Sequence, residues 1–414
     1  MTDPVLLSVV IPVHGVASYL DDCLDSVLGP PGSSDPGPPI EVIAVDDRSP
    51  DESPAILDRR AAADPRLRVI HLPAALGPGG ARNTGLAAAT GEYVWFVDGD
   101  DLLAQGALAA VAERLTRQPC DVLLIGHETF YPSGRTHPDP GAALLAATDG
   151  ELVRLADRPE LINLSMTCWS KVPRLAFLRG LGVAFGPGIH EDVPVSAAAL
   201  LTADRIGALA RVCYRYRRGR AASLTTRTSA ANFRIFDSYQ SIFDFMNERL
   251  REASAAPLAA GGTTAASQPT GVSQPTGVSQ PTEFGRPTEF GRPSGRIVVT
   301  DAVRGALFER AIWHYSVILA TGGFGVGRFG VGGMVPRRRR REFFDRMSAD
   351  FARLRPAGYQ LPPGARGAKL RLVERDAYLT YSLLEPVNRL RVRLLGLRAA
   401  LGRLARYGTA GGRT

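Results

Sequence analysis

The chain has 414 residues, of which 45% are hydrophobic and 22% charged, values typical of a globular protein and not of an intrinsically disordered one. At about 150 residues per domain, this length predicts two or three folded units. Lys+Arg outnumber Asp+Glu by 49 to 41, and residues 334–414 alone hold nineteen basic and six acidic residues. The net positive charge therefore lies in the C-terminal part, and it excludes no class of function for residues 1–333.

The chain contains four cysteines: Cys23, Cys120, Cys168 and Cys213. They lie far apart and form no Cys-x-x-Cys pair, which argues against a disulfide scaffold or a zinc finger and predicts free thiols in a reducing cytosol. The N-terminus is not typical of a signal peptide, and no stretch reaches the ~18 to 20 uncharged apolar residues of a membrane-spanning helix. We expect a cytoplasmic protein, soluble or peripheral at the inner face of the cell membrane.

Composition divides the chain into three regions. Residues 1–250 alternate short apolar runs with helical patterns, which predicts one folded domain. Residues 251–296 are rich in Ala, Gly, Ser, Pro and Thr and contain near-repeats of six residues, such as SQPTGV. A β-helix would need more apolar residues than these repeats hold, so they predict a disordered linker. Residues 297–414 predict a basic helical region.

Within residues 1–250, the sequence predicts strands that alternate with helices. Apolar runs predict strands over residues 6–11, 40–45, 67–72 and 93–97, and helical spacing is present over residues 20–28, 53–63 and 80–90. Continuous apolar strands alternating with helices predict an α/β domain whose parallel sheet is covered on both faces. Ligands bind such sheets beyond the carboxyl ends of the strands. Three segments fall there and should meet in one crevice: Pro12-Val13-His14-Gly15, Asp46-Asp47 and Asp98-Gly99-Asp100-Asp101.

The acidic segments allow two interpretations each. Asp98, Asp100 and Asp101 could share Mg²⁺ or Mn²⁺, which prefer oxygen ligands, or could form an acidic turn that caps the next helix. Asp46 and Asp47 could accept hydrogen bonds from a base or ribose, or could cap the helix that follows them.

These segments, in this order and spacing, resemble the family 2 glycosyltransferases, which have the GT-A (nucleotide-diphospho-sugar transferase) fold. The resemblance rests on residues 8–15, 45–51, 80–85 (Gly-Ala-Arg-Asn-Thr-Gly) and 91–101. It continues in Gly188-Ile189-His190-Glu191-Asp192 and in Tyr214-Arg215-Tyr216-Arg217, and it covers about residues 5–250. The similarity is to bacterial members that build or decorate cell-surface polysaccharides, including teichoic-acid-type enzymes.

The resemblance implies a role for each matching residue. The donor site would comprise Pro12, Val13, Asp46, Asp47, Arg82, Asp98, Arg215 and Arg217. Mg²⁺ or Mn²⁺ would be held by Asp100 and Asp98. Asp192, with Glu191 as the second choice, would take the proton from the acceptor hydroxyl as general base.

Two of these segments also have a plain structural interpretation. Glu191 and Asp192 precede an apolar helical run, and carboxylates at a helix start suit the helix dipole. Both interpretations can hold, because a helix start is a rigid platform for a base. Arg215 and Arg217 alternate with Tyr214 and Tyr216, which puts guanidinium groups on one face of a strand. They could grip the leaving diphosphate or form a solvated face.

The C-terminal region carries a regular heptad of apolar residues over residues 387–404, flanked by arginines. A basic amphipathic helix can lie on an anionic membrane surface, and a heptad can equally pair with another helix or form a homo-oligomer. A solvated helical face is the third interpretation. The run Arg337 to Arg341 would add affinity for an anionic leaflet. No nucleic-acid partner is expected, because the tail lacks regularly interleaved aromatic residues.

We therefore expect an inverting, metal-assisted glycosyltransferase that moves a sugar from a nucleotide-diphospho-sugar to a polysaccharide or lipid-linked acceptor in cell-envelope glycan synthesis. The alternative is a non-catalytic scaffold that binds a nucleotide or glycan and docks on a polyanion or membrane through its basic tail.

Overall fold

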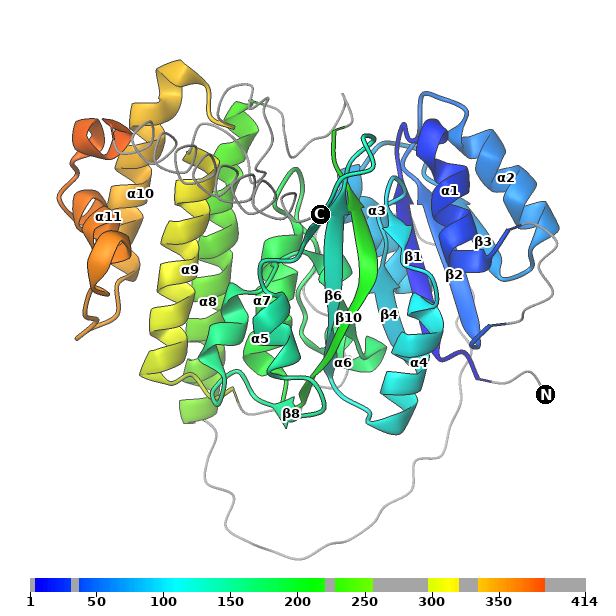
Figure 1. Cartoon of the computed structure of the whole chain (residues 1–414), viewed down its shortest axis with the longest axis horizontal. Coiled ribbons are helices and arrows are strands. Elements are labelled where there is room, and N and C mark those ends of the chain that lie inside the picture. The colour runs from blue at the N-terminus through cyan, green and yellow to red at the C-terminus, as the bar shows by residue number, and fades with distance from the viewer. Residues whose placement is uncertain (1–3, 31–36, 220–227, 256–296, 320–333, 384–414) are drawn as a thin grey trace, which may run out of the picture.

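The computed structural model describes residues 4–30, 37–219, 228–255, 297–319 and 334–383 (Figure 1). A sheet of parallel strands in the order β3-β2-β1-β4 forms the N-terminal half of the fold. The strands are β1 (Leu7–Val13), β2 (Ile40–Asp46), β3 (Leu67–His71) and β4 (Tyr93–Phe96). Helices cover this sheet, and nearly all residues of β1, β2 and β4 are buried, which explains why these strands read as continuous apolar runs.

Three helices of this half lie close to their predicted ranges: α1 (Ala17–Leu28), α2 (Ser53–Ala63) and α3 (Gly77–Ala88). The sequence did not predict α4 (Ala107–Arg117). Strand β1 runs through Pro12, where the sequence predicted its end. The pairing of β1 with β4 stops at Val10, opposite Phe96, so at Pro12 the strand has a partner on one side only. The missing N–H of a proline is tolerated at such an edge.

A second sheet continues the fold in the order β5-β10-β6-β7. Its strands are β5 (Leu102–Leu103), β6 (Val122–Phe130), β7 (Thr136–Pro138) and β10 (Ile206–Arg217), with β8 (Leu152–Val153) on β10 and β9 (Lys171–Pro173) on β6. The long pair β10 and β6 is parallel, and the short strands add to it antiparallel. A bridge between Tyr93 and Arg174 joins the two sheets. The predicted mainly parallel sheet is confirmed.

Shorter helices fill the connections: α5 (Ala142–Ala146), α6 (Leu175–Gly180), α7 (Asp192–Thr202), η1 (Pro159–Asn163), η2 (Cys168–Ser170) and η4 (Ala230–Phe233). The C-terminal half adds α8 (Arg234–Ala255), α9 (Asp301–Leu319), η5 (Arg337–Arg339), α10 (Arg340–Leu354) and α11 (Gly364–Glu374). Figure 1 shows α8, α9, α10 and α11 side by side on the flank of the second sheet. The helical C-terminal region is confirmed, and α8 continues past the predicted domain boundary at residue 250.

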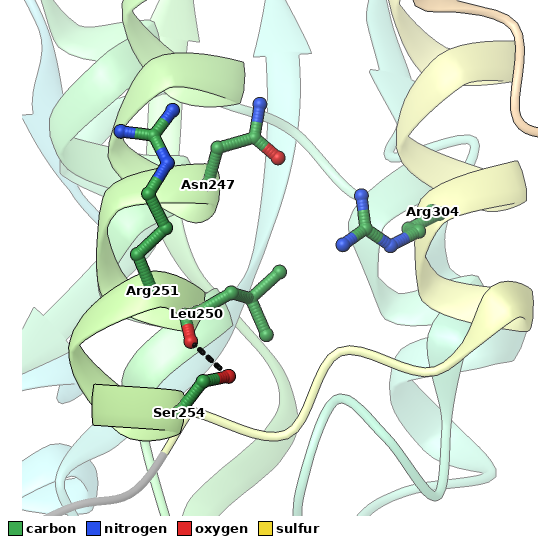
Figure 2. A pocket seen from close by; sticks show the side chains of 5 residues that line it. All are labelled: Asn247, Leu250, Arg251, Ser254 and Arg304. Atoms are coloured by element: carbon green, nitrogen blue, oxygen red, sulfur yellow. Dashed lines mark hydrogen bonds between the residues drawn. The ribbon is translucent and has the colours of Figure 1, made fainter. Parts of the chain in front are cut away.

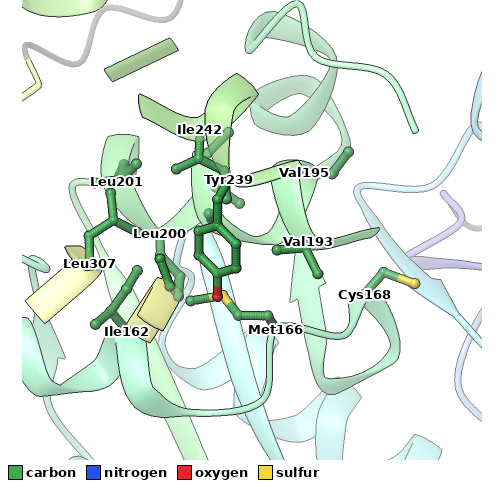
Figure 3. Packing of buried hydrophobic residues seen from close by; sticks show 14 of the residues in the cluster. Ile162, Met166, Cys168, Val193, Val195, Leu200, Leu201, Tyr239, Ile242 and Leu307 are labelled. Atoms are coloured by element: carbon green, nitrogen blue, oxygen red, sulfur yellow. The ribbon is translucent and has the colours of Figure 1, made fainter. Parts of the chain in front are cut away.

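One hydrophobic core joins this helical region to the sheets. It extends without interruption from Val10 in β1 through α7 and α8 to Phe308 in α9, Phe344 in α10 and Tyr381. Figure 3 shows its centre, where Leu200 of α7, Tyr239 of α8 and Leu307 of α9 surround Ile162 of η1. Residues 297–319 and 334–383 are therefore built into the folded domain and are not an appendage to it.

Several predictions of the sequence fall on residues that the structure does not describe. These are most of the repeat segment, residues 256–296, and the heptad segment, residues 387–404. In the described basic run, Arg339 binds Glu342, Arg340 donates to the Leu319 carbonyl, and Arg341 binds Asp345 and Asp376. Only part of this run is therefore left to contact a membrane. No helix among the described residues combines the length and the apolar character that crossing a bilayer requires.

Candidate active site

The three predicted segments do meet at one edge of the first sheet. In the parallel register, Pro12 lies opposite Val45 and Val13 opposite Asp46, while Val97 donates its N–H to the Val10 carbonyl. The main chain of Val13 also accepts the Asp47 N–H at 2.8 Å. The carboxyl ends of β1, β2 and β4 therefore bring the acidic segments together, as expected for this class of sheet.

Asp46 and Asp47 are both 4% exposed, and both carboxylates already accept hydrogen bonds. Asp46 accepts the Ser49 N–H at 3.0 Å and binds His71 Nδ1 at 3.1 Å. Asp47 accepts the N–H groups of Leu76 and Gly77 at 2.6 and 2.8 Å, which anchors the start of α3. These two hydrogen bonds cap a helix, as the structural interpretation of the sequence predicted. The capped helix is α3, however, and not α2, which follows Asp47 in sequence. A carboxylate has about four acceptor sites, so each can still accept from a ligand.

The segment Asp98 to Asp101 splits into two environments. Asp101 is fully buried and accepts the Tyr214 hydroxyl at 2.7 Å and the Arg217 N–H at 2.6 Å. Burial, with Asp100 and Asp98 close by, raises the pKa of Asp101 well above its ordinary value. The Asp98 side chain is 24% exposed, and Arg82 donates to one of its oxygens at 2.7 Å. The segment does not cap α4, which begins at Ala107.

A divalent cation fits the chemistry of this segment. Three carboxylates in four residues repel one another, and the raised pKa of Asp101 shows that the local field disfavours further negative charge. Within the described residues no three His, Cys, Asp or Glu side chains come close enough to hold a metal ion by themselves. Mg²⁺ commonly uses only one or two carboxylates together with substrate phosphates, so Asp98 and Asp100 would be enough as the ligands that the protein supplies.

Arg82 connects this segment to the candidate base. It lies on α3, is 4% exposed, and donates to Asp98 at 2.7 Å through one terminal nitrogen and to Glu191 at 2.5 Å through the other. Sequence reasoning placed Arg82 in the donor site. In the structure its guanidinium is an internal bridge between two acidic residues that are far apart in sequence.

Glu191 and Asp192 stand at the start of α7, as the helix-start interpretation predicted. Burial raises the pKa of both carboxyl groups, for Glu191 with the adjacent Asp192 and for Asp192 with Asp98 as further causes, while Arg82 acts in the opposite direction on both. The Asp192 carboxylate accepts the Cys168 N–H at 3.2 Å. A carboxyl group that holds its proton more strongly than usual is better suited to accept one from a hydroxyl.

The alternation along β10 is confirmed by its contacts. Trp169 stacks on Tyr214 and Tyr216 on one face, with ring centroids 4.4 and 5.7 Å apart. On the other face the guanidinium groups of Arg215 and Arg217 both lie 4.8 Å from the Phe130 ring centroid. Each of these two guanidinium groups also binds an oxygen atom of the protein.

Arg215 binds Glu128 at 2.7 Å, and Arg217 Nε donates to the Asp100 carbonyl at 2.7 Å. Arg217 thus fixes the main chain of the acidic segment from a neighbouring strand.

Some of the chemistry could not be anticipated. Trp169 and Lys171, which lie between the acidic segment and Glu191 in sequence, are 5% and 3% exposed, so Trp169 is a core residue and Lys171 is buried. The His190 ring binds Asn232 at 3.3 Å and not the neighbouring carboxylates. The Cys168 N–H on Asp192 has no signature in the sequence, because every non-proline residue carries that donor.

The four cysteines are buried and free, as the sequence predicted. Burial raises the pKa of Cys120 to about 11 and that of Cys213 to about 12. Such thiols stay protonated and unreactive at neutral pH.

Two cavities of about 610 and 520 Å³ lie apart from this site. Figure 2 shows the first, lined by Asn247, Leu250, Arg251 and Ser254 of α8 and by Arg304 of α9. Asn247 and Arg304 also line the second, which reaches the end of α10. Neither of these two cavities is lined by an acidic residue of the candidate site.

Comparisons with known proteins agree with this geometry. The family model for glycosyl transferase family 2 matches residues 8–157. An uncharacterized glycosyltransferase, EpsJ, of Bacillus subtilis is 30% identical over 215 residues, and the poly(ribitol-phosphate) beta-N-acetylglucosaminyltransferase TarS of Staphylococcus aureus is 30% identical over 212 residues. The matched parts span 51% of this chain and 61% of EpsJ, and 50% of this chain and 35% of TarS.

The crystal structure of residues 1–349 of S. aureus TarS in complex with UDP-GlcNAc superposes with a TM-score of 0.61 at 21% identity. The superposition covers 93% of this chain and 92% of that one, so it includes the C-terminal helices. The sheet order, the meeting of the acidic segments and these matches lead to one conclusion. Residues 8–157 match the family 2 glycosyl transferases, and the chain has the GT-A fold.

Proposed function

We propose that this protein is an inverting glycosyltransferase that moves a sugar from a nucleotide-diphospho-sugar to a hydroxyl group of a polysaccharide or lipid-linked acceptor in cell-envelope glycan synthesis. The observation that carries the proposal is the Arg82 bridge between Asp98 and Glu191. The bridge supports the proposal because Asp98, on the donor side, and Glu191, the neighbour of the proposed base, bind the two sides of one buried guanidinium.

Asp192 is proposed as the general base. Burial raises its pKa, so it takes a proton from an acceptor hydroxyl more readily than an exposed aspartate does. Burial also raises the pKa of Glu191, but Glu191 is the less suitable base because its carboxylate is held in an ion pair by Arg82 and is less free to reach an acceptor hydroxyl. Attack of the activated hydroxyl on the anomeric carbon, opposite the leaving diphosphate, inverts that centre.

The donor side is assigned to the strand ends. Asp46 and Asp47 would accept from the nucleotide base or ribose beside the Pro12-Val13 turn, and Arg215 and Arg217 face the side where a diphosphate would leave. Asp98 and Asp100 would hold Mg²⁺ or Mn²⁺, whose charge supplies electrostatic stabilisation of a leaving diphosphate when it is bound. Removing the ion is therefore expected to abolish turnover.

The relatives support this choice of substrates. They include a succinoglycan biosynthesis protein, a minor teichoic acid biosynthesis protein and a poly(ribitol-phosphate) beta-glucosyltransferase. Two crystal structures of TarS contain UDP-GlcNAc or UDP. From the similarity to these proteins we infer that the acceptor is a cell-envelope polymer and the donor a nucleotide sugar. Action at the cytoplasmic face of the membrane stays a prediction.

The first test is a donor screen. Purified protein is incubated with UDP-, GDP- and dTDP-sugars and Mn²⁺ or Mg²⁺, and release of the nucleotide diphosphate is followed with water or bacterial envelope glycan as acceptor. Asp192→Asn should lower kcat by about 10² to 10⁴-fold, the usual contribution of a general base. Asp204→Asn, on an exposed aspartate after α7, is the matched control and should leave the rate unchanged.

Chelation completes the test. EDTA and Asp100→Asn should each remove activity, and excess Mn²⁺ should restore it only after EDTA. Nucleotide-diphosphate release that persists in EDTA and in both variants would contradict the proposal.

A further inference from the structure

We propose that the segment 163–171 is the positioning element of the general base, and that it does this through the Cys168 main-chain N–H. The inference rests on the proposed role of Asp192. It adds that α9, outside the part of the chain matched by the family model, holds this segment in place.

The Cys168 N–H makes the one hydrogen bond that the Asp192 carboxylate receives from the described residues, at 3.2 Å. Asp192 is the first residue of α7, so its backbone is fixed by the helix while its side chain can still rotate. A donor on one carboxylate oxygen selects one rotamer and leaves the other oxygen to accept the proton. A misplacement of about 1 Å can cost a factor of 10² in rate, so one such bond matters.

Lys171 folds the segment around its buried ammonium group. Its Nζ donates to the carbonyl oxygens of Ser165 at 2.5 Å and Thr167 at 3.2 Å and to Ser170 Oγ at 3.3 Å. An ammonium has three donors, so these three contacts use all of them. Lys171 therefore has no donor left for an acceptor, and its contacts define the loop that carries the Cys168 amide.

Arg310 anchors the start of the segment from α9. Its guanidinium, 8% exposed, donates to the Asn163 carbonyl at 3.1 Å and lies over the Trp313 ring. Ile162, just before the segment, and Met166 within it pack in the same core as Leu307 of α9 (Figure 3). Helix α9 thus contacts the segment that supports the base, although no residue of α9 was assigned a role from the sequence.

The chemistry of these contacts favours positioning over simple packing. Burying a lysine and an arginine is costly unless all donors are used, and apolar side chains of similar volume generally fill a core at lower cost. Lys171 spends its three donors on oxygen atoms within the segment, and Arg310 donates to the carbonyl at its start, while Arg310 Nε is buried without a hydrogen-bond partner among the described residues. Their common effect is to hold the main chain on either side of Cys168.

Proline at position 168 tests the amide directly. Cys168 opens the helix η2, and Thr167 before it has φ −80° and ψ 146°, the conformation that a following proline favours. Cys168→Pro therefore removes the N–H with little backbone strain, and Cys168→Ala, which keeps the N–H, is the matched control. With water as acceptor and the donor found in the screen, Cys168→Pro should lower kcat about tenfold to hundredfold and leave the donor KM unchanged.

The background variant Asp192→Asn separates this mechanism from others. Because the amide acts through Asp192, Cys168→Pro added to Asp192→Asn should lower the residual rate no further. A further fall of tenfold or more in that background would overturn the inference, as would a Cys168→Pro variant with wild-type kcat. If the wild type releases no nucleotide diphosphate, or Asp192→Asn is fully active, the proposed function itself fails first.

A second pair of variants tests the anchor on α9. Arg310→Met should lower kcat at unchanged donor KM, and Arg310→Lys, which keeps a donor, should recover part of it. The control is Arg249→Met on α8, an arginine that also donates to a main-chain carbonyl, that of Leu181, away from the base. Equal kcat losses in Arg310→Met and Arg249→Met would show a general effect on folding and refute the anchor.

Discussion

Lys171 is the clearest example of a single residue whose burial sets a measurable property. Burial lowers its pKa from the usual 10.5 to about 8. The folded-state pKa lies below the unfolded one, so between these values the unfolded chain binds more protons, and stability rises with pH. The difference corresponds to about 3 kcal/mol at most.

The measurement is urea unfolding of the wild type and Lys171→Met at several pH values from 7 to 10.5. The stability of the wild type relative to the variant should increase across that window and change little below pH 7. Titration of the tyrosines and thiols is common to both proteins and cancels. A difference that is flat in pH would show that the fold leaves the pKa of Lys171 at its ordinary value.

At the same scale, the sequence predicted the carboxylates and not their partners. Asp98 and Asp192 could be found because acidic residues after buried strands or at a helix start are conspicuous. The Cys168 N–H and the Tyr214 hydroxyl on Asp101 could not, because main-chain donors have no residue signature and a tyrosine in an apolar strand looks like core. The assignment of Arg82 to the donor site stays a prediction, and its bridge to Glu191 could not be predicted because it depends on a tertiary contact.

At the scale of elements, the packing of α3 on β1 depends on Gly85. A Cβ atom there would lie 2.3 Å from Val10 Cγ1, a separation that side chains cannot accept. Gly85→Ala should therefore destabilise the protein by about 1 to 3 kcal/mol, the usual cost of overpacking a core.

The matched control is Gly305→Ala in α9, where the added Cβ would meet the Tyr359 ring at an ordinary 3.6 Å. It should stabilise by about 0.5 to 1 kcal/mol, because alanine favours a helix over glycine. Thermal unfolding of both variants checks the pair. Equal shifts in Tm of the same sign would contradict the close approach of α3 to β1.

The four strands of the first sheet and the helices α1, α2 and α3 could be predicted because their apolar patterns are continuous. Helix α3 begins at Gly77 and not near Gly80, because Asp47 fixes the N–H groups at its start, a contact from another strand. The strands β5, β7, β8 and β9 have two or three residues each, too few for a periodic pattern. They exist because longer strands beside them offer free edges.

At the scale of the whole molecule, the C-terminal helices complete the core. Tyr239 of α8, Phe308 of α9 and Phe344 of α10 are fully buried in one continuous cluster. A chain that ends at residue 255 would expose the α8 face of this cluster to water. We expect it to be insoluble or to bind hydrophobic dyes strongly, whereas a chain that ends at residue 383 keeps every described contact and should unfold cooperatively.

Sequence patterns could show that residues 297–383 are helical, but not where those helices pack. Amphipathic spacing gives the apolar face of a helix and says nothing of its partner, which here is η1 and α8. A truncated chain ending at residue 255 that melts like the wild type would show that this interface is dispensable.

The Arg82 bridge has a consequence for recombining this protein with its relatives. One guanidinium satisfies carboxylates contributed by two distant stretches of chain, so a crossover between residues 98 and 191 would join an arginine from one parent to a glutamate from the other. A hybrid with its junction between residues 98 and 191 keeps both ion pairs of Arg82 only if the two parents place these charged residues at the same spacing. Junctions within residues 256–296 avoid that dependence, provided that the η1 and α9 surfaces are mutually compatible.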